Sequence, residues 1–343
     1  MELWESASIG NMTLRNRTVR SATNEHLAGR DGAITEALVE CYEELAAHQV
    51  GLVITGHYAV DALARVDAGQ PSLDERTDRT LLKAAADRVH AKGGKVVIQL
   101  NHGGLKASEK LNGRPFRGPM ELTAEDRADL LKRYRFAARL AREAGFDGVQ
   151  VHMAHGYLLS SFLNPKENTR TDRYGGNVEN RFRFPGEVLR AVREEWGLED
   201  PVLVKVNCDA VEDLHQVLKL CQEAGASAAE ISGIRFASEE INGEPFYLKK
   251  VIEAREGISM PLILVGGIYS RKAAEQVLQA GIPFVSFSRS LICEPDFIEK
   301  LKNGAEKSRC IHCNHCFQVY RERYRRCILH EKEIPQLRET FGA

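Results

Sequence analysis

The residues best suited to chemistry in this sequence are two histidines and a tyrosine that follow a short apolar run. The pattern of residues 146–152 predicts a buried strand, which leads into His152, His155 and Tyr157. Imidazole N–H groups can hold an anionic or carbonyl oxygen, and a phenol beside them can hand over a proton. Structural histidines are one alternative. A metal pair is another, but the spacing is not the helical His-Glu-x-x-His arrangement and no third ligand is evident.

Two polar side chains interrupt other apolar segments. Lys205 lies within residues 201–207, and Gln99 lies near the end of residues 95–100. A charge within an apolar strand needs an anionic partner, from the protein or from a cofactor. A satisfied polar network in the core would explain either residue alone. Because both side chains would point to the same mouth as His152, a bound polar heterocycle explains them better together.

Two further strand ends carry residues that are suited to a phosphate group. Gly266 and Gly267 allow backbone amides to approach a ligand closely, although they could also form only a tight turn. Ser288 and Arg289 end the next predicted strand. An arginine at this place favours a phosphate site, which many α/β barrels build from their last two strand ends.

The elements that must position these residues alternate regularly along the chain. The predicted strands are 18–23, 51–60, 95–100, 146–152, 201–207, 226–232, 261–267 and 283–289. The predicted helices are 36–48, 78–91, 124–144, 178–195, 211–224, 247–255, 271–279 and 295–301. The strands are Val, Ile and Leu runs with little alternation, as parallel strands covered on both faces should be. This pattern predicts an α/β fold, a (β/α)8 TIM barrel, preceded by a hairpin at 9–17.

The main alternative fold is a doubly wound sheet. No Gly-x-Gly-x-x-Gly follows any predicted strand, so a dinucleotide-binding domain of that kind is unsupported. We assign residues 1–301 to the barrel and residues 302–343 to a Cys-rich C-terminal extension. The formal net charge of −1, spread over interspersed charges, argues against nucleic acid or an anionic membrane as the main partner. The N-terminus has no basic segment before an apolar core, and we expect a cytoplasmic protein.

Four of the eight cysteines crowd into one short segment with spacings of two, two and ten residues. These are Cys310, Cys313, Cys316 and Cys327. Four thiolates suffice for one [4Fe–4S] cluster. Zinc is the alternative, because His312, His315 and His330 lie among them, and free thiols are a third possibility. A basic run follows, with Arg321, Arg323, Arg325 and Arg326. It could form a solvated helix face, or it could bind a CoA phosphate or an acidic protein.

The sequence resembles the Old Yellow Enzyme family over residues 9–297. The densest and most specific part of this resemblance is residues 152–181, HMAHGYLLSSFLNPKENTRTDRYGGNVENR. Members of this family are FMN-dependent ene-reductases on a (β/α)8 barrel. The resemblance implies that His152 and His155 hold the activating oxygen of the substrate and that Tyr157 protonates the carbon that becomes anionic after hydride arrives. Arg170 and Arg181 would brace the barrel mouth.

The resemblance also implies how the flavin would be held. Gln99 and Lys205 would contact its pyrimidine edge. The first two strand ends would touch the flavin through Ala22, Thr23 and Gly56. The phosphate would be bound by Gly266, Gly267, Ser288 and Arg289. Three positions depart from the family pattern: Asn24 stands where many members have Cys or Thr, Leu105 where many have Arg, and His57 where a small residue is usual.

The cysteine spacing is similar to that of the iron–sulfur branch of the family, which includes 2,4-dienoyl-CoA reductase and trimethylamine dehydrogenase. Those enzymes carry further nucleotide-binding domains; we expect none here, with electrons coming from NAD(P)H or from a separate protein. We predict an oxidoreductase that reduces the activated C=C bond of an enone or an enoyl- or dienoyl-type substrate, CoA thioesters included. Two alternatives are an electron carrier or redox sensor and a colourless zinc-containing lyase. We expect a homo-oligomer.

Overall fold

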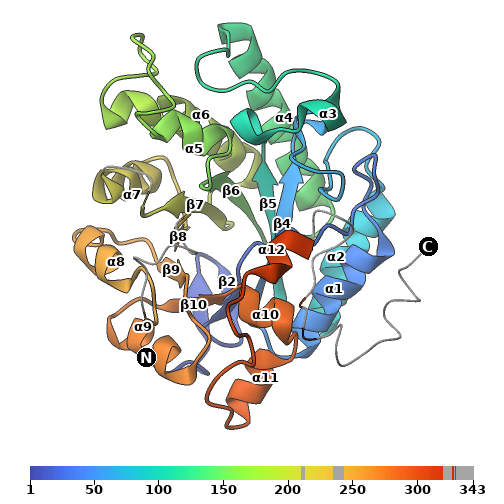
Figure 1. Cartoon of the computed structure of the whole chain (residues 1–343), viewed down its shortest axis with the longest axis vertical. Coiled ribbons are helices and arrows are strands. Elements are labelled where there is room, and N and C mark those ends of the chain that lie inside the picture. Colours follow the sequence, from blue (N-terminus) through green and yellow to red (C-terminus); the bar gives the residue numbers. More distant parts are fainter. Residues whose placement is uncertain (210–212, 235–242, 320–326, 328, 330–343) are drawn as a thin grey trace.

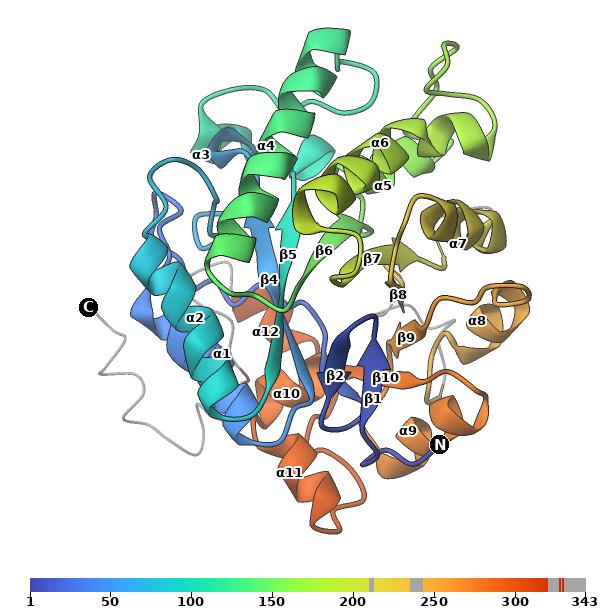
Figure 2. The same ribbon diagram turned by 180° about the vertical axis from the view of Figure 1, so that it is seen from behind.

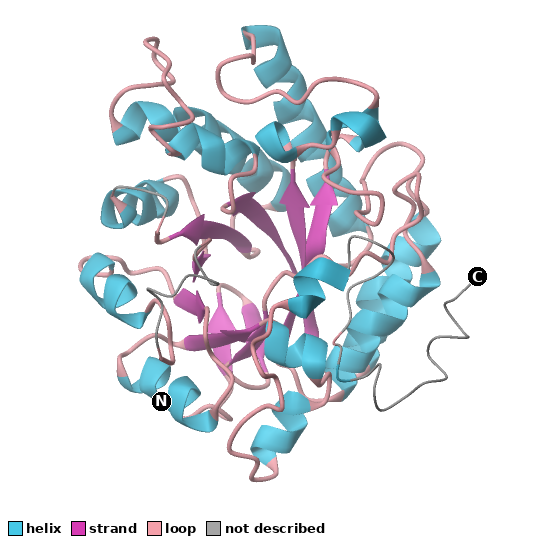
Figure 3. Cartoon of the chain, viewed as in Figure 1, coloured by secondary structure: helices cyan, strands magenta, loops and turns pink. Residues whose placement is uncertain are grey.

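Eight parallel strands form a closed barrel at the centre of the structure, which confirms the predicted (β/α)8 fold (Figures 1 and 3). The computed structural model describes residues 1–209, 213–234, 243–319, 327 and 329. The barrel strands are β3 (Thr18–Arg20), β4 (Leu52–Ala59), β5 (Lys95–Asn101), β6 (Gly148–Met153), β7 (Val202–Asn207), β8 (Ala228–Ser232), β9 (Leu262–Val265) and β10 (Phe284–Phe287). They follow one another in chain order around the barrel, and β10 pairs with β3 to close it.

A ring of helices covers the outside of the barrel (Figures 1 and 2). These helices are α1 (Glu36–Ala47), α2 (Arg79–Ala91), α4 (Ala124–Glu143), α6 (Val178–Trp196), α7 (Leu214–Glu223), α8 (Leu248–Ala254), α9 (Arg271–Gln279) and α11 (Phe297–Lys302). The helix α4 begins at a capping box, in which the Thr123 hydroxyl accepts from the Asp126 N–H and the Asp126 carboxylate accepts from the Thr123 N–H. Its buried face includes Leu130, Tyr134 and Ala138. The periodic apolar stripe that predicted each long helix is therefore the face that packs on the barrel.

Shorter helical segments lie in the loops, and the sequence did not predict them. They are η1 (Ala62–Ala64), η2 (Gly104–Lys106), α3 (Glu109–Asn112), α5 (Leu158–Leu163), α10 (Arg289–Cys293) and α12 (His315–Val319). Each has six residues or fewer, which is under two helical turns. A segment of that length cannot display a repeating apolar stripe, so periodicity does not identify it.

The predicted N-terminal hairpin closes one end of the barrel. Its strands β1 (Ala7–Ile9) and β2 (Met12–Leu14) pair antiparallel, and Gly10, with φ +57°, lies in the turn. The side chains of Ile9, Met12 and Leu14 are buried and pack against inward-facing residues of the barrel strands. Figure 2 shows this hairpin at the end of the barrel that faces the viewer. The closed end of the barrel is therefore apolar.

The opposite half of the barrel interior is polar. Five side chains there are at most 2% exposed: Gln99, Gln150, Lys205, Glu230 and Ser286. They lie in the middle of their strands or toward the carboxyl ends, where α/β barrels place their active sites. The interior thus changes along the barrel axis from an apolar plug to a polar layer, and that layer supports the site.

The beginning of the C-terminal extension packs on the barrel mouth. Lys307 forms an isolated antiparallel bridge with Ser270, and the Ser308 hydroxyl donates to the Glu294 carboxylate over 2.8 Å. The division at residue 302 stays a prediction. His330 and the four arginines of the basic run, 321, 323, 325 and 326, lie outside the described residues. In the part of the chain that is described, no helix combines the length and apolar character needed to cross a lipid bilayer.

Candidate active site

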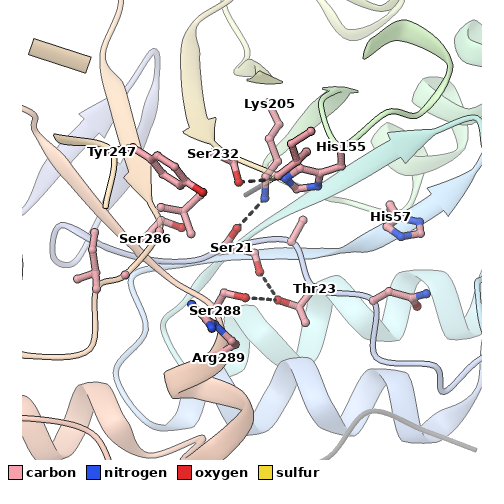
Figure 4. Close-up of a pocket in the computed structure, with 18 of the residues that line it drawn as sticks. Ser21, Thr23, His57, His155, Lys205, Ser232, Tyr247, Ser286, Ser288 and Arg289 are labelled. Carbon is pink, nitrogen blue, oxygen red and sulfur yellow. Dashed lines mark hydrogen bonds between the residues drawn. The ribbon is translucent and has the colours of Figure 1, made fainter. Parts of the chain in front are cut away.

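A cavity of about 330 Å³ opens at the carboxyl ends of the barrel strands, within the size range of small-molecule sites (Figure 4). Residues of both predicted groups line it, the chemical one and the phosphate one. The predicted residues in its lining are Ala22, Thr23, Asn24, His152, His155, Tyr157, Lys205, Gly266, Gly267, Ser288 and Arg289. The structure therefore brings together segments that lie more than 250 residues apart in the chain.

Two predicted residues, Gly56 and Gln99, are not in this lining. Gly56 packs instead against Glu25 and Thr23, where a Cβ atom would lie 2.3 Å from Glu25 Oε2 and 2.9 Å from the Thr23 carbonyl oxygen. Only glycine fits so close an approach. Gln99 is fully buried in the polar layer of the barrel interior. Contact of either residue with a flavin stays a prediction.

The floor of the cavity is a network of buried polar side chains around an ion pair. Lys205 Nζ lies 3.2 Å from Glu230 Oε2 and donates to the Ser21 hydroxyl over 2.7 Å. The Ser286 hydroxyl donates to Glu230 Oε1 over 2.7 Å. The Gln150 amide donates to Glu230 Oε2 over 3.2 Å and accepts from Gln99 Nε2 over 2.6 Å. We call these residues the floor: Ser21, Gln99, Gln150, Lys205, Glu230 and Ser286.

The ion pair keeps the floor charged. Burial raises the pKa of Glu230. The charge of Lys205 and hydrogen bonds from Ser286, Ser21 and Gln150 lower that pKa by more than burial raises it, so the net shift is downward. Burial lowers the pKa of Lys205, and the Glu230 carboxylate opposes that shift. The anionic partner that Lys205 was predicted to need is thus supplied by the protein. Lys205 still lines the cavity and presents a cation to whatever binds there.

One wall of the cavity consists of aromatic and imidazole rings. We call these residues the wall: His57, His152, His155 and Tyr157. The Tyr157 ring centroid lies 5.0 Å from that of His152 and 5.1 Å from that of His57. Tyr157 is the residue before α5, whose six side chains are all buried and so fix its position. The predicted proton donor therefore stands among the predicted oxygen-binding histidines.

Two of the wall histidines, His152 and His155, are shifted toward their neutral forms. Burial lowers the pKa of His152 well below its usual value, and the neighbouring basic groups lower it further. Burial and Lys205 do the same to the pKa of His155. His152 Nδ1 accepts from the Ala154 N–H over 3.2 Å, so the proton of the neutral ring is on Nε2. His155 Nε2 lies 3.0 Å from the Ser232 hydroxyl. Each ring keeps one N–H, which can bind an oxygen of a substrate without carrying charge.

The predicted phosphate corner also has a structural explanation for its glycines. Gly266 and Gly267 have φ angles of +131° and +62°, and added Cβ atoms would come within 2.5 Å of the Tyr247 ring and 2.1 Å of the Phe246 ring. The turn alternative therefore accounts for the glycines. Arg289 donates to Asn314 Oδ1 over 2.5 Å and lines the cavity. The phosphate role of this corner stays a prediction.

Sequence reasoning missed several residues of the site. Glu230 gave the same signal as Lys205, a charge within an apolar strand, but went unnoticed in residues 226–232. Ser21, Ser286 and Tyr247 gave no signal, because serine and tyrosine are common at strand ends and in loops. Asn24, one of the departures from the family pattern, donates to Asp67 Oδ2 over 2.7 Å. The predicted bracing residues act on loops near the mouth: Arg170 donates to the Pro119 carbonyl and Arg181 to the Leu163 carbonyl.

Two buried polar atoms, one in the cavity lining and one in the floor, suggest that the cavity is made for a polar ligand. Gln99 Oε1 and the Tyr247 hydroxyl are buried and have no hydrogen-bond partner within the described residues. Such atoms are costly unless a ligand or water completes them. Together with the cationic groups of Lys205 and Arg289, they fit an anionic heterocyclic phosphate such as FMN.

The cysteine cluster is only partly described. Cys310 and Cys316 are half-buried, Cys313 is exposed, and Cys327 lies near Cys293 of α10, where it raises the pKa of the Cys293 thiol. Burial raises the pKa of Cys310. Within the described residues, no three His, Cys, Asp or Glu side chains are arranged as a metal site. A [4Fe–4S] cluster or zinc at these thiols therefore stays a prediction.

Comparison with known proteins places the chain in a family. Residues 2–308 match the family described as NADH:flavin oxidoreductase / NADH oxidase. An NADH oxidase from Thermoanaerobacter brockii is 31% identical over 344 residues, which cover 91% of this chain and 52% of the relative. A 4,4'-dithiodibutanoate disulfide reductase from Rhodococcus erythropolis is 30% identical, and the alignment covers 98% of both chains.

Solved structures agree on the fold. A 2-naphthoyl-CoA reductase in complex with 2-naphthoyl-CoA superposes with a TM-score of 0.87 at 23% identity, over 95% of this chain and 56% of the other. The chain thus spans about half the length of this reductase and of the NADH oxidase. The family match covers nearly the whole barrel and bears out the resemblance carried by residues 152–181. The chain therefore belongs to the NADH:flavin oxidoreductase / NADH oxidase family, the Old Yellow Enzyme family.

Proposed function

We propose that this protein is an FMN-dependent oxidoreductase that reduces the activated C=C bond of an enone or of an enoyl- or dienoyl-type compound. The observation that carries the proposal is the arrangement of one cavity, with a charged floor at Lys205 and a neutral, proton-bearing wall at His152 and Tyr157. A reduced flavin needs a cation close to it, and the floor supplies one. A carbonyl-activated alkene needs hydrogen-bond donors, and the wall supplies them in the same cavity.

The floor and the phosphate corner would hold the cofactor. Lys205 and Gln99 would contact the pyrimidine edge of FMN, and the buried Gln99 Oε1 would gain the hydrogen bond that it lacks within the described residues. Ser288 and Arg289 would bind the phosphate, and Ala22, Thr23 and Asn24 would border the ring system. When bound, FMN supplies a hydride from its reduced form.

The wall would bind and protonate the substrate. The N–H groups of His152 and His155 would hold the carbonyl oxygen, which draws electron density from the double bond and stabilises the negative charge that develops there. Because burial keeps both rings neutral, they donate hydrogen bonds without adding two charges to an already cationic cavity. Tyr157 would give its phenolic proton to the α-carbon.

The electron donor and the substrate class follow from the family and the cavity. NADH is the donor in the family name and NADPH in the names of several relatives, and we propose NAD(P)H for this chain. The solved structure with 2-naphthoyl-CoA holds a CoA thioester, and thioesters are among the activated carbonyl compounds that the wall could bind. We include CoA thioesters in the proposed substrate range. A separate electron-transfer protein and association into a homo-oligomer also remain proposals.

We propose further that the four clustered thiols hold a [4Fe–4S] cluster, with zinc as the alternative. A [4Fe–4S] cluster is held by four cysteine thiolates, and four thiols lie here within 18 residues. Cys310 and Cys313 precede α12, and Cys316 lies within this helix, whose Phe317 lines the cavity. A cluster there would adjoin the cavity, on the side of Arg289 and Asn314.

One absorbance spectrum of anaerobically purified protein, with iron and zinc assays on the same sample, tests the cofactors. Flavin bands with a broad iron–sulfur shoulder support the proposal, and zinc without iron selects the alternative. Protein that stays colourless and cannot be reconstituted with FMN would refute the flavin. Oxidation of NAD(P)H that depends on an added enone or enoyl-CoA tests the activity. Rapid exchange with a ferredoxin or flavodoxin and no alkene turnover would identify an electron carrier instead.

The variant Tyr157→Phe tests the proton donor. It should leave flavin reduction by NAD(P)H unchanged and slow alkene reduction by roughly 10²-fold or more, the usual contribution of a positioned acid. Stopped-flow measurement of the two half-reactions separates them. Equal slowing of both would argue against this role for Tyr157.

A further inference from the structure

His57 lies on β4 at the point where the strand is irregular. The register between β4 and β5 shifts between Ile54 and His57, which is the signature of a β-bulge. A bulge re-aims the side chains beyond it, and here the His57 ring lines the cavity while only 7% exposed. Its centroid lies 5.1 Å from that of Tyr157 and 6.0 Å from that of His152 (Figure 4 labels His57).

A buried glutamine fixes which nitrogen of His57 carries the proton. Gln70 is fully buried, and its Oε1 accepts from the Val66 N–H over 2.7 Å. Its amide nitrogen must therefore face His57, where Nε2 lies 2.6 Å from His57 Nδ1 and donates to the His57 carbonyl over 3.1 Å. An amide N–H can only donate, so His57 Nδ1 accepts. A neutral imidazole that accepts at Nδ1 has its proton on Nε2.

That proton points at the proposed acid. His57 Nε2 lies 3.3 Å from the Tyr157 hydroxyl oxygen, so the ring donates to the phenol oxygen. A hydrogen bond to the oxygen is stronger when the oxygen is anionic, and it therefore favours the tyrosinate over the phenol. The backbone of Val66 thus orients Gln70, Gln70 orients His57, and His57 orients Tyr157.

We propose that His57 is a positioning residue for Tyr157: its Nε2–H holds the phenol oxygen and stabilises the tyrosinate that is left after proton transfer. The inference rests on the proposed function for its catalytic part. In that step the O–H bond of Tyr157 breaks and a C–H bond forms at the α-carbon, which holds the electron pair released when hydride adds to the β-carbon. The phenolate is then reprotonated by water from the open cavity.

The other titratable groups that face this pair come from three elements or their adjoining loops. They are His152 on β6, His155 after β6, Lys106 on η2 and Lys205 on β7. Lys106 and Lys205 also favour an anionic Tyr157, so His57 adds to a field that is already positive. A substitution at His57 should consequently shift the ionisation of Tyr157 without abolishing it.

The first experiment observes the proton directly and needs no turnover. Nitrogen-15 NMR of the histidine rings in the FMN-loaded protein, assigned by loss of signals in His57→Phe, should give the Nε2–H tautomer for His57. The Nδ1–H tautomer would overturn the proposal, because His57 would then have no proton to donate to Tyr157.

The second experiment measures the ionisation of Tyr157 by carbon-13 NMR of ζ-labelled tyrosine, assigned with Tyr157→Phe. In His57→Phe the tyrosinate should form about one pH unit higher than in the parent protein, the size expected for one lost hydrogen bond. His57→Gln, whose amide can donate, should recover part of the shift. The control Tyr58→Phe alters the neighbouring buried residue of β4 and should cause none. Equal titration of Tyr157 in His57→Phe and the parent protein overturns the proposal.

The third experiment uses the reaction. In single-turnover assays His57→Phe should reduce the alkene about tenfold more slowly, with its alkaline limb moved up by about one pH unit, while flavin reduction by NAD(P)H stays unchanged. Slowing of both half-reactions alike would overturn the positioning role. If the parent protein reduces no alkene, the proposed function fails, and the two NMR measurements still decide whether His57 donates to Tyr157.

Discussion

Lys205 on the floor and His152 on the wall are each 2% exposed, yet their charges differ. Lys205 lies 3.2 Å from the Glu230 carboxylate, and the pair stays ionised. His152 is surrounded by His155, His57, Lys205 and Lys106, all of them basic, and its pKa falls well below the usual value. Equal burial therefore gives a charged floor and a neutral wall, because only the floor contains a carboxylate.

This difference suits the two halves of the proposed reaction. A fixed cation beneath the cavity stabilises an anionic reduced cofactor, whereas neutral N–H donors stabilise an oxygen whose charge develops only in the transition state. Substitutions in the floor and in the wall should therefore have different effects on stability, on the flavin potential and on cofactor binding.

The largest effect should come from removing the floor cation. Lys205→Met leaves Glu230 buried without its counter-ion, and such a change typically costs about 3–5 kcal/mol in the free energy of unfolding. FMN retention should weaken, or the flavin potential should fall. Urea denaturation compares this variant with the double variant Lys205→Met/Glu230→Leu, which replaces the pair by apolar groups and should recover much of the loss. Equal stability of the single and double variants would show that the pair is not the source of the effect.

Acidification should affect the wall before the floor. Burial lowers the pKa of His152 and His155, and it lowers the pKa of His102, after β5, to about 4. As the pH falls below about 6.5 the unfolded chain binds protons that the folded chain does not, so stability declines. His102 alone should contribute about 3 kcal/mol of loss between pH 6.5 and 4. Glu230, with a lowered pKa, loses its contribution only below about 4.5.

Urea midpoints measured from pH 7.5 to 4 test this order. The decline should begin near pH 6.5, and His102→Asn should have a shallower slope than the parent protein over the same range. A midpoint that stays constant down to pH 4.5 would mean that the buried histidines are protonated in the folded state, and the neutral wall would be wrong.

Removing the floor anion should act in the opposite direction from removing the cation. Glu230→Gln keeps the shape and the hydrogen-bond acceptor for Ser286 but leaves the positive charge of Lys205 unbalanced. An anionic reduced flavin is then better stabilised, so the midpoint potential should rise, on the order of 30 mV if the gain is about 1.4 kcal/mol. Ser286→Ala, which removes one hydrogen bond and no charge, is the matched control for spectroelectrochemical titration. A fall in potential would contradict the assigned balance.

The difference between floor and wall also shows how far the sequence could predict this structure. The eight strands were predictable because each lies in a short, mostly apolar run with little alternation, as expected for a strand buried on both faces. Lys205 and His152 were predictable because each is a polar residue in such a run. The pairing of Lys205 with Glu230 was not, since it depends on the register between β7 and β8, which aligns these two residues.

The neighbourhood of Gly56 and His57 shows a second limit. Sequence reasoning assigned Gly56 to the flavin site and named His57 only as a departure from the family pattern. The bulge in β4 directs His57 into the cavity, whereas Gly56 packs against Glu25, and its contact with a flavin stays a prediction. A bulge depends on how two strands pair, and neither strand's own sequence encodes it. The same holds for α5 and α10, which are too short to show a periodic pattern.

The smallest effect on stability should come from Gln99, where folding and binding make different demands. Its Nε2 donates to Gln150, but its buried Oε1 has no partner within the described residues. Gln99→Leu therefore removes one satisfied and one unsatisfied group together, and the free energy of unfolding of the FMN-free protein should change by about 1 kcal/mol or less. If FMN completes Oε1, the same substitution should weaken FMN binding by roughly tenfold, as measured by fluorescence titration. Lys205→Met should strongly change both the free energy of unfolding and FMN binding. If Gln99→Leu instead binds FMN normally, Lys205 would be the flavin contact of the floor and Gln99 would not.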